Sequence, residues 1–401
     1  MDTYSAGMSL RVLQIHNKYR TPGGEDVLAQ MERDLLVQHG HIVDQLFFDN
    51  HNISEGWWYK VKAGIDAIYN FSSAREVQSR ITSFQPDIIH VINFFPLLSP
   101  SVFYVASRNK IPIVATINNY RLICANALLF RENQICERCI NSWFPLSGIR
   151  YRCYHNSAIQ SLAVTLMATV HKSLGTWQHK VDKFIIAMTD YGRVKFLNSS
   201  LHLPAEKSVL KPNFVADPGE GIQPREDYYV FFARLSPEKG VETLLQSLDH
   251  YPYRLKIIGD GPLRSQVEQC VQKNPNVEYL GLRKLDEVME IVKKCRAVIM
   301  PSIWYEALPL SVIGTLATGT PSIISDVPSF LELIEEGTTG FHFKTGDAKD
   351  LAEKIRQFDS RLKENQPMYQ HARQVYLRSY SPQSNYHQLL SIYQSVLRHD
   401  A

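Results

Sequence analysis

Short runs of β-branched and other apolar residues, separated by stretches with helical spacing, recur along the whole chain. In the first half these runs are residues 10–15, 42–48, 87–93, 111–117 and 183–188. Strands that alternate with helices favour parallel sheets covered on both faces, because each parallel connection must cross from one end of the sheet to the other. The pattern therefore predicts an α/β chain built from doubly wound, Rossmann-like sheets.

The strand pattern stops near residue 212 and then starts again. Residues 213–221 include the turn formers Asp217, Pro218 and Gly219, and this composition predicts a linker. A second series of runs follows at 228–233, 255–258, 277–280, 297–300 and 322–325. We expect Rossmann-like domains over 1–212 and 222–380, a linker over 213–221 and a C-terminal helix over 381–401. Such sheets bind ligands at the carboxyl ends of their strands, so two domains facing a central cleft predict a site there.

Charge and length restrict the classes of partner. Residues 108–211 carry 14 basic and 5 acidic side chains, which fits an anionic partner such as a membrane surface, or a solvated face. No nucleic-acid-binding motif accompanies this excess, so no nucleic acid is expected as a partner.

No apolar run reaches the roughly 18 residues of a membrane span, and the first ten residues do not resemble a signal peptide. We expect a cytoplasmic protein, with peripheral contact at the inner face of the membrane as the alternative.

Residues 231–240 join the end of a predicted strand to the start of a helix. Arg234 and Lys239 stand on either side of a Ser-Pro turn, so both could reach one anion beside the positive end of the helix. A leaving diphosphate needs fixed positive charge of this kind. The alternative is a basic loop neutralised by Glu238 and solvent.

Two further strand ends carry glycines and an acid. Gly259 and Gly261 lack the third glycine of the dinucleotide fingerprint, so a structural turn is favoured over NAD binding.

Glu306 precedes an apolar helix whose first backbone N–H groups would suit a phosphate. Its carboxylate could accept hydrogen bonds from sugar hydroxyls, or it is a helix-entry acid favoured by the helix dipole.

Taken in order along the chain, these motifs resemble glycosyltransferase family 4. The matching residues are Gly23 and Gly24, the Arg234 and Lys239 pair, Gly259-Asp-Gly261, and Glu306 ahead of an Ala-Thr-Gly-Thr-Pro ending, with residues 87–93, 95–100 and 119–124. Members of this family have the GT-B fold and are retaining glycosyltransferases that use nucleotide sugars. The resemblance covers nearly the whole chain and implies a hexosyltransferase-type enzyme of polysaccharide biosynthesis. It implies a nucleotide-diphosphate sugar as donor and a glycan or lipid-linked acceptor.

The resemblance also implies roles for individual residues. Arg234 and Lys239 would hold the donor diphosphate, and Glu306 and Asn118 would contact the donor sugar. The donor-binding residues implied are Gly23, Gly24, Gly259, Gly261, Leu308, Pro309 and Leu310. Retention would come from front-face attack, in which the leaving phosphate helps to deprotonate the acceptor and the protein supplies orientation and charge. No catalytic cofactor is expected, and the chain contains no Asp-x-Asp motif.

Three positions depart from the pattern of the family. Gly314 stands where a second Glu grips the ribose, Asn118 replaces a His, and Ile92 replaces another His of close relatives. These departures leave open a non-catalytic GT-B relative that acts as a binding or scaffold subunit of a glycosyltransferase complex. A nucleotide-sugar epimerase of the same fold is a third alternative.

Four of the six cysteines cluster in the segment 124–153. Cys124, Cys136, Cys139 and Cys153 follow a C-x11-C-x2-C-x13-C spacing, and four thiolates would complete a structural zinc site. The alternative is buried free thiols.

Two apolar segments bear on membrane contact. Trp57, Trp58 and Tyr59, with Lys60 and Lys62, would suit a membrane interface, or they are core aromatics of a helix. The apolar stretch 158–170 is too short to span a bilayer and predicts a buried helix.

Overall fold

The computed structural model describes residues 9–18, 24–49, 64–362, 364 and 366–397. These residues form two compact units, each built around a six-stranded sheet. The first unit comprises residues 1–129, 137–211 and 386–401, and the second comprises 130–136 and 212–385. The chain therefore passes from the first unit to the second after Lys211, and most of its last helix belongs to the first unit.

The sheet of the first unit is parallel, with strand order β2-β1-β3-β4-β7-β8. Its strands are β1 (Arg11–Lys18), β2 (Ile42–Asp49), β3 (Ile88–Asn93), β4 (Ile113–Ile117), β7 (Lys183–Ile186) and β8 (Ser208–Leu210). The helices between them are α1 (Gly24–Gln38), α3 (Phe71–Phe84), α4 (Ser101–Asn109), α5 (Leu146–Arg150), α6 (Ala158–Ser173), α7 (Thr176–His179) and α8 (Asp190–Leu197). Six successive residues of β1 are buried, as a strand covered on both faces requires.

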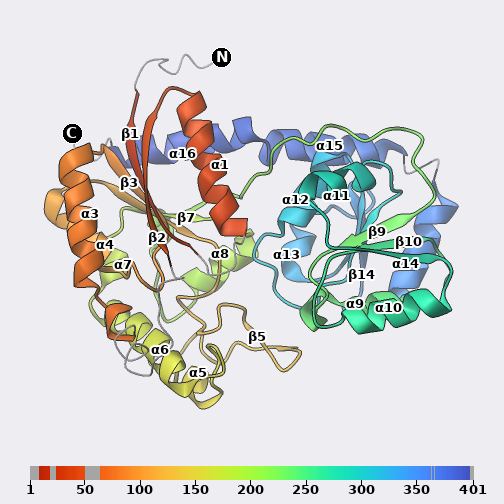
Figure 1. The fold of residues 1–401 in the computed structure, drawn as a ribbon, viewed down its shortest axis with the longest axis horizontal. Helices are drawn as coiled ribbons and strands as arrows, with labels where there is room; N and C mark the ends of the chain where they lie inside the picture. Colours follow the sequence, from red (N-terminus) through yellow and green to blue (C-terminus); the bar gives the residue numbers. More distant parts are fainter. Residues whose placement is uncertain (1–8, 19–23, 50–63, 363, 365, 398–401) are drawn as a thin grey trace. The chain divides into compact units, whose positions relative to one another are not determined.

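The second unit repeats this design of helices around a central sheet (Figure 1). Its strand order is β11-β10-β9-β12-β13-β14. Its strands are β9 (Tyr229–Phe232), β10 (Leu255–Ile258), β11 (Val277–Gly281), β12 (Val298–Met300), β13 (Ser322–Ser325) and β14 (Gly340–Phe343). Its helices are α9 (Val241–Ser247), α10 (Arg264–Lys273), α11 (Leu285–Val292), α12 (Leu310–Ala317), α13 (Pro328–Leu331), α14 (Ala348–Ser360), α15 (Gln366–Ser379) and the start of α16 (Pro382–Leu397). A short hairpin, β5 (Phe130–Arg131) with β6 (Gln134–Ile135), is counted with this unit.

Alternate residues of the central strands β9 and β12 enter different hydrophobic cores. Tyr229 and Phe231 of β9 pack in one core, with residues of α9, α10 and α14. Val230 between them packs in the other core, with residues of α11, α12 and α15. This period of two confirms the predicted doubly wound architecture, because helices cover both faces of the sheet.

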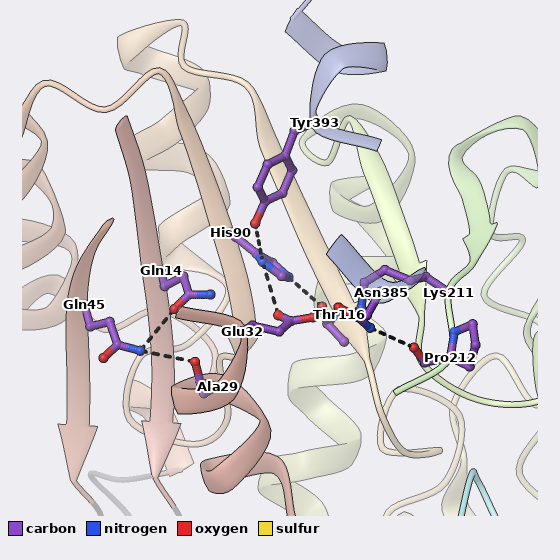
Figure 2. Close-up of polar contacts among 10 residues, drawn as sticks. All are labelled: Gln14, Ala29, Glu32, Gln45, His90, Thr116, Lys211, Pro212, Asn385 and Tyr393. Carbon is purple, nitrogen blue, oxygen red and sulfur yellow. Dashed lines mark hydrogen bonds and ion pairs between the residues drawn. The ribbon is translucent and has the colours of Figure 1, made fainter. Parts of the chain in front are cut away.

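A buried polar network joins α1, β3 and α16 within the first unit (Figure 2). Lys211 Nζ donates to Glu32 Oε1 at 2.8 Å, and both side chains are nearly inaccessible to water. His90 contacts the Tyr393 hydroxyl through Nδ1 at 2.8 Å and the Thr116 hydroxyl through Nε2 at 2.7 Å. Burial lowers the pKa of His90 to about 4, so the imidazole is neutral at pH 7. The network therefore fixes α16 on the first unit.

Helix α6 forms where the apolar stretch predicts it, but the prediction that it is buried is wrong for one face. Ile159 is 58% exposed and Leu162 is 38% exposed, whereas Val164 and Met167 are buried. No helix among the described residues is long and apolar enough to cross a membrane.

Candidate active site

The predicted anion-binding loop and the predicted acidic loop lie next to each other in the second unit. They follow β9 and β12, which are neighbours in the sheet although β10 and β11 lie between them in sequence. The order of the strands reverses between β9 and β12, and ligands bind at such a switch point in open α/β sheets. The backbone N–H of Ile303 donates to the carbonyl of Glu238 at 2.9 Å and joins the two loops.

Gly240 allows the two loops to approach this closely. Its backbone has φ +70°, and a Cβ atom at this position would lie 1.7 Å from the carbonyl oxygen of Pro301. Any side chain here would force the loop after β9 away from the loop after β12. The glycine that ends the motif Ser-Pro-Glu-Lys-Gly is therefore a packing requirement of the site.

Lys239 and Glu306 form an ion pair between these loops. Lys239 Nζ donates to Glu306 Oε1 at 2.7 Å, and the Ser302 hydroxyl donates to the same oxygen at 2.7 Å. The Glu306 side chain is only 6% exposed, while that of Lys239 is 22% exposed. Oε2 of Glu306 makes no hydrogen bond with any residue that the structure describes. One carboxylate oxygen is thus committed to the protein and the other is available to a ligand.

Arg234 and Trp304 lie on the same two loops as this pair. Arg234 is exposed on the loop after β9, and its side chain makes no hydrogen bond or ion pair within the described part of the chain. Lys239 Nζ lies 5.2 Å from the centre of the Trp304 ring, within the range of a cation–π contact. The Trp304 indole nitrogen is buried and has no hydrogen-bond partner among the described residues. The site therefore holds two cations, an acid and an aromatic ring.

Gly259 and Gly261 lie at the end of β10, beside the loop after β9. A Cβ atom at Gly259 would lie 1.9 Å from the carbonyl oxygen of Ala233, and one at Gly261 would lie 2.5 Å from that of Leu235. The backbone N–H of Leu235 also donates to the carbonyl of Asp260 at 3.0 Å. The two glycines thus let two loops pack together, as the predicted structural turn requires, and their donor-binding role stays a prediction.

The predicted donor-binding residues Leu308, Pro309 and Leu310 lead into α12 from the loop that holds Glu306. No side chain caps the start of this helix. Gly314, in the middle of α12, is buried, and a Cβ atom there would lie 3.3 Å from the sulfur of Met289 on α11. The space next to this position is therefore filled by Met289.

The first unit contains a separate pocket at the carboxyl ends of β3 and β4 and the first turn of α1. Asn93, Asn118, Asn119, Glu25 and Ile92 are among the residues that line it. The Asn119 side-chain amide donates to Glu25 Oε1 at 3.0 Å. The predicted site residue Asn118 thus lies in an amide-rich pocket, in a different unit from Glu306.

Aromatic rings and one cation form the rest of this pocket. The Arg121 guanidinium lies 4.8 Å from the centre of the Tyr154 ring and 5.2 Å from that of Phe95. Its Nη1 donates to the carbonyl of Ala125 at 2.6 Å, which holds the side chain in place. Amides that bond hydroxyls and rings that cover apolar faces are groups that suit a polar organic ligand.

The other predicted residues lie at the start of α1, in the segment 124–153 or outside the described residues. Gly24 begins α1, and Gly23 lies outside the described residues, as do Trp57, Trp58, Tyr59, Lys60 and Lys62. Among the described residues there is no group of three or more His, Cys, Asp or Glu side chains that could hold a metal ion. Burial raises the pKa of the Cys124 thiol, which disfavours its thiolate. A zinc site of Cys124, Cys136, Cys139 and Cys153 therefore stays a prediction from their spacing.

Sequence reasoning did not single out Ser302, Trp304 or Gly240. Ser302 and Trp304 flank the predicted acid within the residues 301–306, and Gly240 ends the predicted anion-binding motif. The feature that could have identified them is their position directly after β9 and β12, which are neighbours in the sheet. Their contacts depend on the order of the strands, which the sequence pattern alone does not specify.

Comparison with known proteins finds a family match for most of the second unit. Residues 216–375, which contain the Lys239–Glu306 site, match the family described as Glycosyl transferases group 1. The chain is 30% identical over 298 residues to a sulfoquinovosyl transferase of Arabidopsis thaliana, a match that covers 69% of this chain and 51% of that protein. It is also 30% identical over 131 residues to an uncharacterized glycosyltransferase of Methanocaldococcus jannaschii, covering 32% of this chain and 37% of that protein. The chain thus spans about a third to a half of the length of these relatives.

A solved structure extends the comparison to the whole chain. The structure of Anabaena HepE in complex with UDP superposes with a TM-score of 0.65 at 15% identity and covers 97% of this chain and 100% of that one. At this identity the likeness shows the fold, which confirms the predicted GT-B class. The match is also consistent with family 4, which the motifs resemble. Residues 216–375 of this chain thus match the group 1 glycosyl transferases, and the chain as a whole has the GT-B fold.

Proposed function

We propose that this protein transfers a sugar from a nucleotide-diphosphate sugar to a glycan or lipid-linked acceptor, with retention of configuration. The observation that carries the proposal is the Lys239–Glu306 pair at the switch point of the second sheet, with the exposed Arg234 on the same loop as Lys239. A diphosphate and a sugar need this combination of cations and a hydrogen-bond acceptor.

The donor diphosphate would bind to Arg234 and Lys239. Arg234 makes no ion pair within the described residues, so binding a phosphate would not require it to give up a protein partner. The backbone N–H groups at the start of α12 would add positive potential on the other side of the same site. These groups would stabilise the charge that develops on the leaving diphosphate.

Glu306 would position the donor sugar. Lys239 and the Ser302 hydroxyl hold its Oε1, so Oε2 is the oxygen that would accept a hydrogen bond from a sugar hydroxyl. The reaction proposed here has no covalent intermediate. The acceptor hydroxyl would attack from the side of the leaving group, and a phosphate oxygen of the leaving diphosphate would take its proton. The enzyme would contribute orientation and charge stabilisation.

The pocket of the first unit is the proposed acceptor site. Its asparagine amides can bond sugar hydroxyls, and Tyr154 and Phe95 offer ring surfaces to a sugar. Because the similar structure of Anabaena HepE was solved with UDP, uridine diphosphate sugars are the first donors to test.

The first test is binding of UDP, GDP and ADP and of their sugar conjugates, measured by thermal shift and calorimetry. We expect one nucleotide to raise the unfolding temperature, since a ligand at about 100 times its Kd stabilises the native state by about 2.7 kcal/mol. Arg234→Ala should weaken binding of that nucleotide about tenfold or more, because a charged hydrogen bond is worth about 1.5–3 kcal/mol. Arg254→Ala, at another exposed arginine of the same unit, is the matched control and should change nothing. Failure of every nucleotide to bind the folded protein would contradict the proposal.

A further inference from the structure

Helix α6 exposes apolar side chains on its outer face, while its buried face holds both polar and apolar residues. Ile159, Leu162, Leu166 and Val170 are spaced three or four residues apart and therefore share one face of the helix. Ile159 is 58% exposed and Leu162 is 38% exposed. The chain has no charged residue from Ser157 to Val170. A solvated helix normally carries charged or polar residues on its outer face, so this exposed stripe requires an explanation.

Hydrogen bonds fix the rotation of α6. The Ser161 hydroxyl accepts a hydrogen bond from the backbone N–H of Tyr154 at 2.9 Å. His171 bonds the carbonyl of Ile68 through Nε2 at 2.8 Å and the Thr176 hydroxyl through Nδ1 at 2.9 Å. Turning the helix to bury Ile159 and Leu162 would break these bonds and expose Val164 and Met167. The outward apolar face is therefore built into the fold.

Neighbouring segments extend this apolar surface. Helix α5 lies alongside α6 and carries Leu146, which is 62% exposed (Figure 1). On another side of α6, a Cβ atom added at Gly64 would lie 3.1 Å from Cβ of Ala163, so residue 64 touches the helix. Ile65, the next residue, is 64% exposed. We call Ile65, Leu146, Ile159 and Leu162, with Arg150 and Arg152, the α5–α6 surface.

The charged side chains of the chain segment that contains α5 and α6 are all basic, whereas Asp66 follows Ile65. Between Glu137 and Asp182 the chain carries five Lys or Arg residues and no acidic residue. Arg150 and Arg152, which follow one another closely at the end of α5, are exposed, and neither forms an ion pair within the described residues. An apolar helical face beside unpaired cations complements a membrane surface with anionic headgroups, where the apolar side chains enter the acyl boundary and the cations meet phosphates.

We propose that the α5–α6 surface docks the protein on an anionic phospholipid membrane. This inference goes beyond the proposed sugar transfer and does not depend on it. It also concerns residues other than the tryptophans at 57 and 58, which lie outside the described part of the chain. Docking through α6 would place the pocket of the first unit close to the lipid surface, because Tyr154 both lines that pocket and bonds Ser161 of α6.

The test is co-sedimentation of the full chain with vesicles of phosphatidylcholine alone, or of phosphatidylcholine with about one third phosphatidylglycerol. We expect binding to the anionic vesicles and much weaker binding to the neutral ones. Ile159→Ser with Leu162→Ser should weaken binding about tenfold or more, since both side chains would otherwise enter the membrane. Arg150→Gln with Arg152→Gln should weaken it as well and reduce its dependence on salt.

The matched control is Leu282→Ser with Leu285→Ser, at two leucines of the second unit that are 79% and 63% exposed. It should bind vesicles as the unchanged protein does. Thermal unfolding of each variant verifies that it is folded, and nucleotide binding reports on the donor site independently. Equal binding by the α6 variant and the control, or no binding to anionic vesicles, would overturn the proposal. So would a dimer in solution that the α6 substitutions dissociate, because the face would then belong to a second copy of the chain.

Discussion

The two units each contain a lysine–glutamate pair, and the two pairs differ in what surrounds them. The nitrogen–oxygen distances are almost equal, 2.8 Å for Lys211–Glu32 and 2.7 Å for Lys239–Glu306. Lys211 is 1% exposed and lies in a network with His90 and Tyr393, whereas Lys239 is 22% exposed. The first pair is enclosed by its own unit, and the second lies between two loops at a strand switch point.

This difference in exposure separates a structural role for the first pair from the ligand-binding role that we propose for the second. Breaking an enclosed pair leaves a charge that water cannot reach, which is costly to the folded state. A pair at a loop edge can accept a ligand, because Lys239 retains donors and Glu306 retains Oε2 for new hydrogen bonds. We therefore expect substitutions in the first pair to act on stability and those in the second to act on sugar transfer.

The largest expected effect is on the enclosed pair. Lys211→Met should lower the free energy of unfolding by about 3–5 kcal/mol, because it leaves the Glu32 carboxylate buried and unpaired. Urea denaturation followed by fluorescence measures this change. The double variant Lys211→Met with Glu32→Leu should recover part of the loss, since an apolar pair replaces two charges. A loss below about 1 kcal/mol for the single variant would mean that this pair behaves like a surface salt bridge.

The second prediction concerns the pair at the loop edge. Lys239→Met should reduce kcat for sugar transfer about 100- to 1000-fold, as removal of one group that stabilises developing charge typically does. Its effect on the free energy of unfolding should be clearly smaller than that of Lys211→Met, because water reaches this site. Lys273→Met, at an exposed lysine of α10, is the control in both assays. Unchanged turnover by the Lys239 variant would remove this residue from the active site.

The third and smallest prediction is a pH dependence in the first unit. Burial lowers the pKa of His90 to about 4, whereas in the unfolded chain the pKa is near the ordinary histidine value of 6.5. Between these values the unfolded chain binds a proton that the folded chain does not, so stability falls as the pH decreases. From pH 7 to pH 5 this group should remove about 2 kcal/mol.

Urea denaturation across that pH range measures the slope of the free energy of unfolding against pH. The slope is compared between the unchanged protein and a His90→Gln variant. Burial also lowers the pKa values of His16, His41 and His171, so these residues contribute in the same direction. The slope should therefore become shallower in a His90→Gln variant without disappearing. Equal slopes for the variant and the unchanged protein would show that His90 titrates in the folded state as it does in the unfolded chain.

Much of the fold and part of the site could be predicted because their signals are local in sequence. Alternating apolar runs identify strands, since residues two apart share a face whatever the rest of the chain does. The residues of the donor-side site, Arg234, Lys239 and Glu306, are visible as motifs that follow such runs. The apolar residues 158–170 predict a helix from local spacing alone. The face of this helix that is buried depends on the hydrogen bonds that Ser161 and His171 make with other segments.

The sequence pattern specifies a two-sheet α/β protein and the loops that carry its charged motifs, and the resemblance to a known family adds the GT-B class. The contacts of Lys239 with Glu306, of Met289 with the position of Gly314, and of Lys211 with Glu32 appear only in the folded molecule. All three have the same cause. These contacts join residues that are far apart along the chain, so they form only after strand order and helix packing have brought separate segments together.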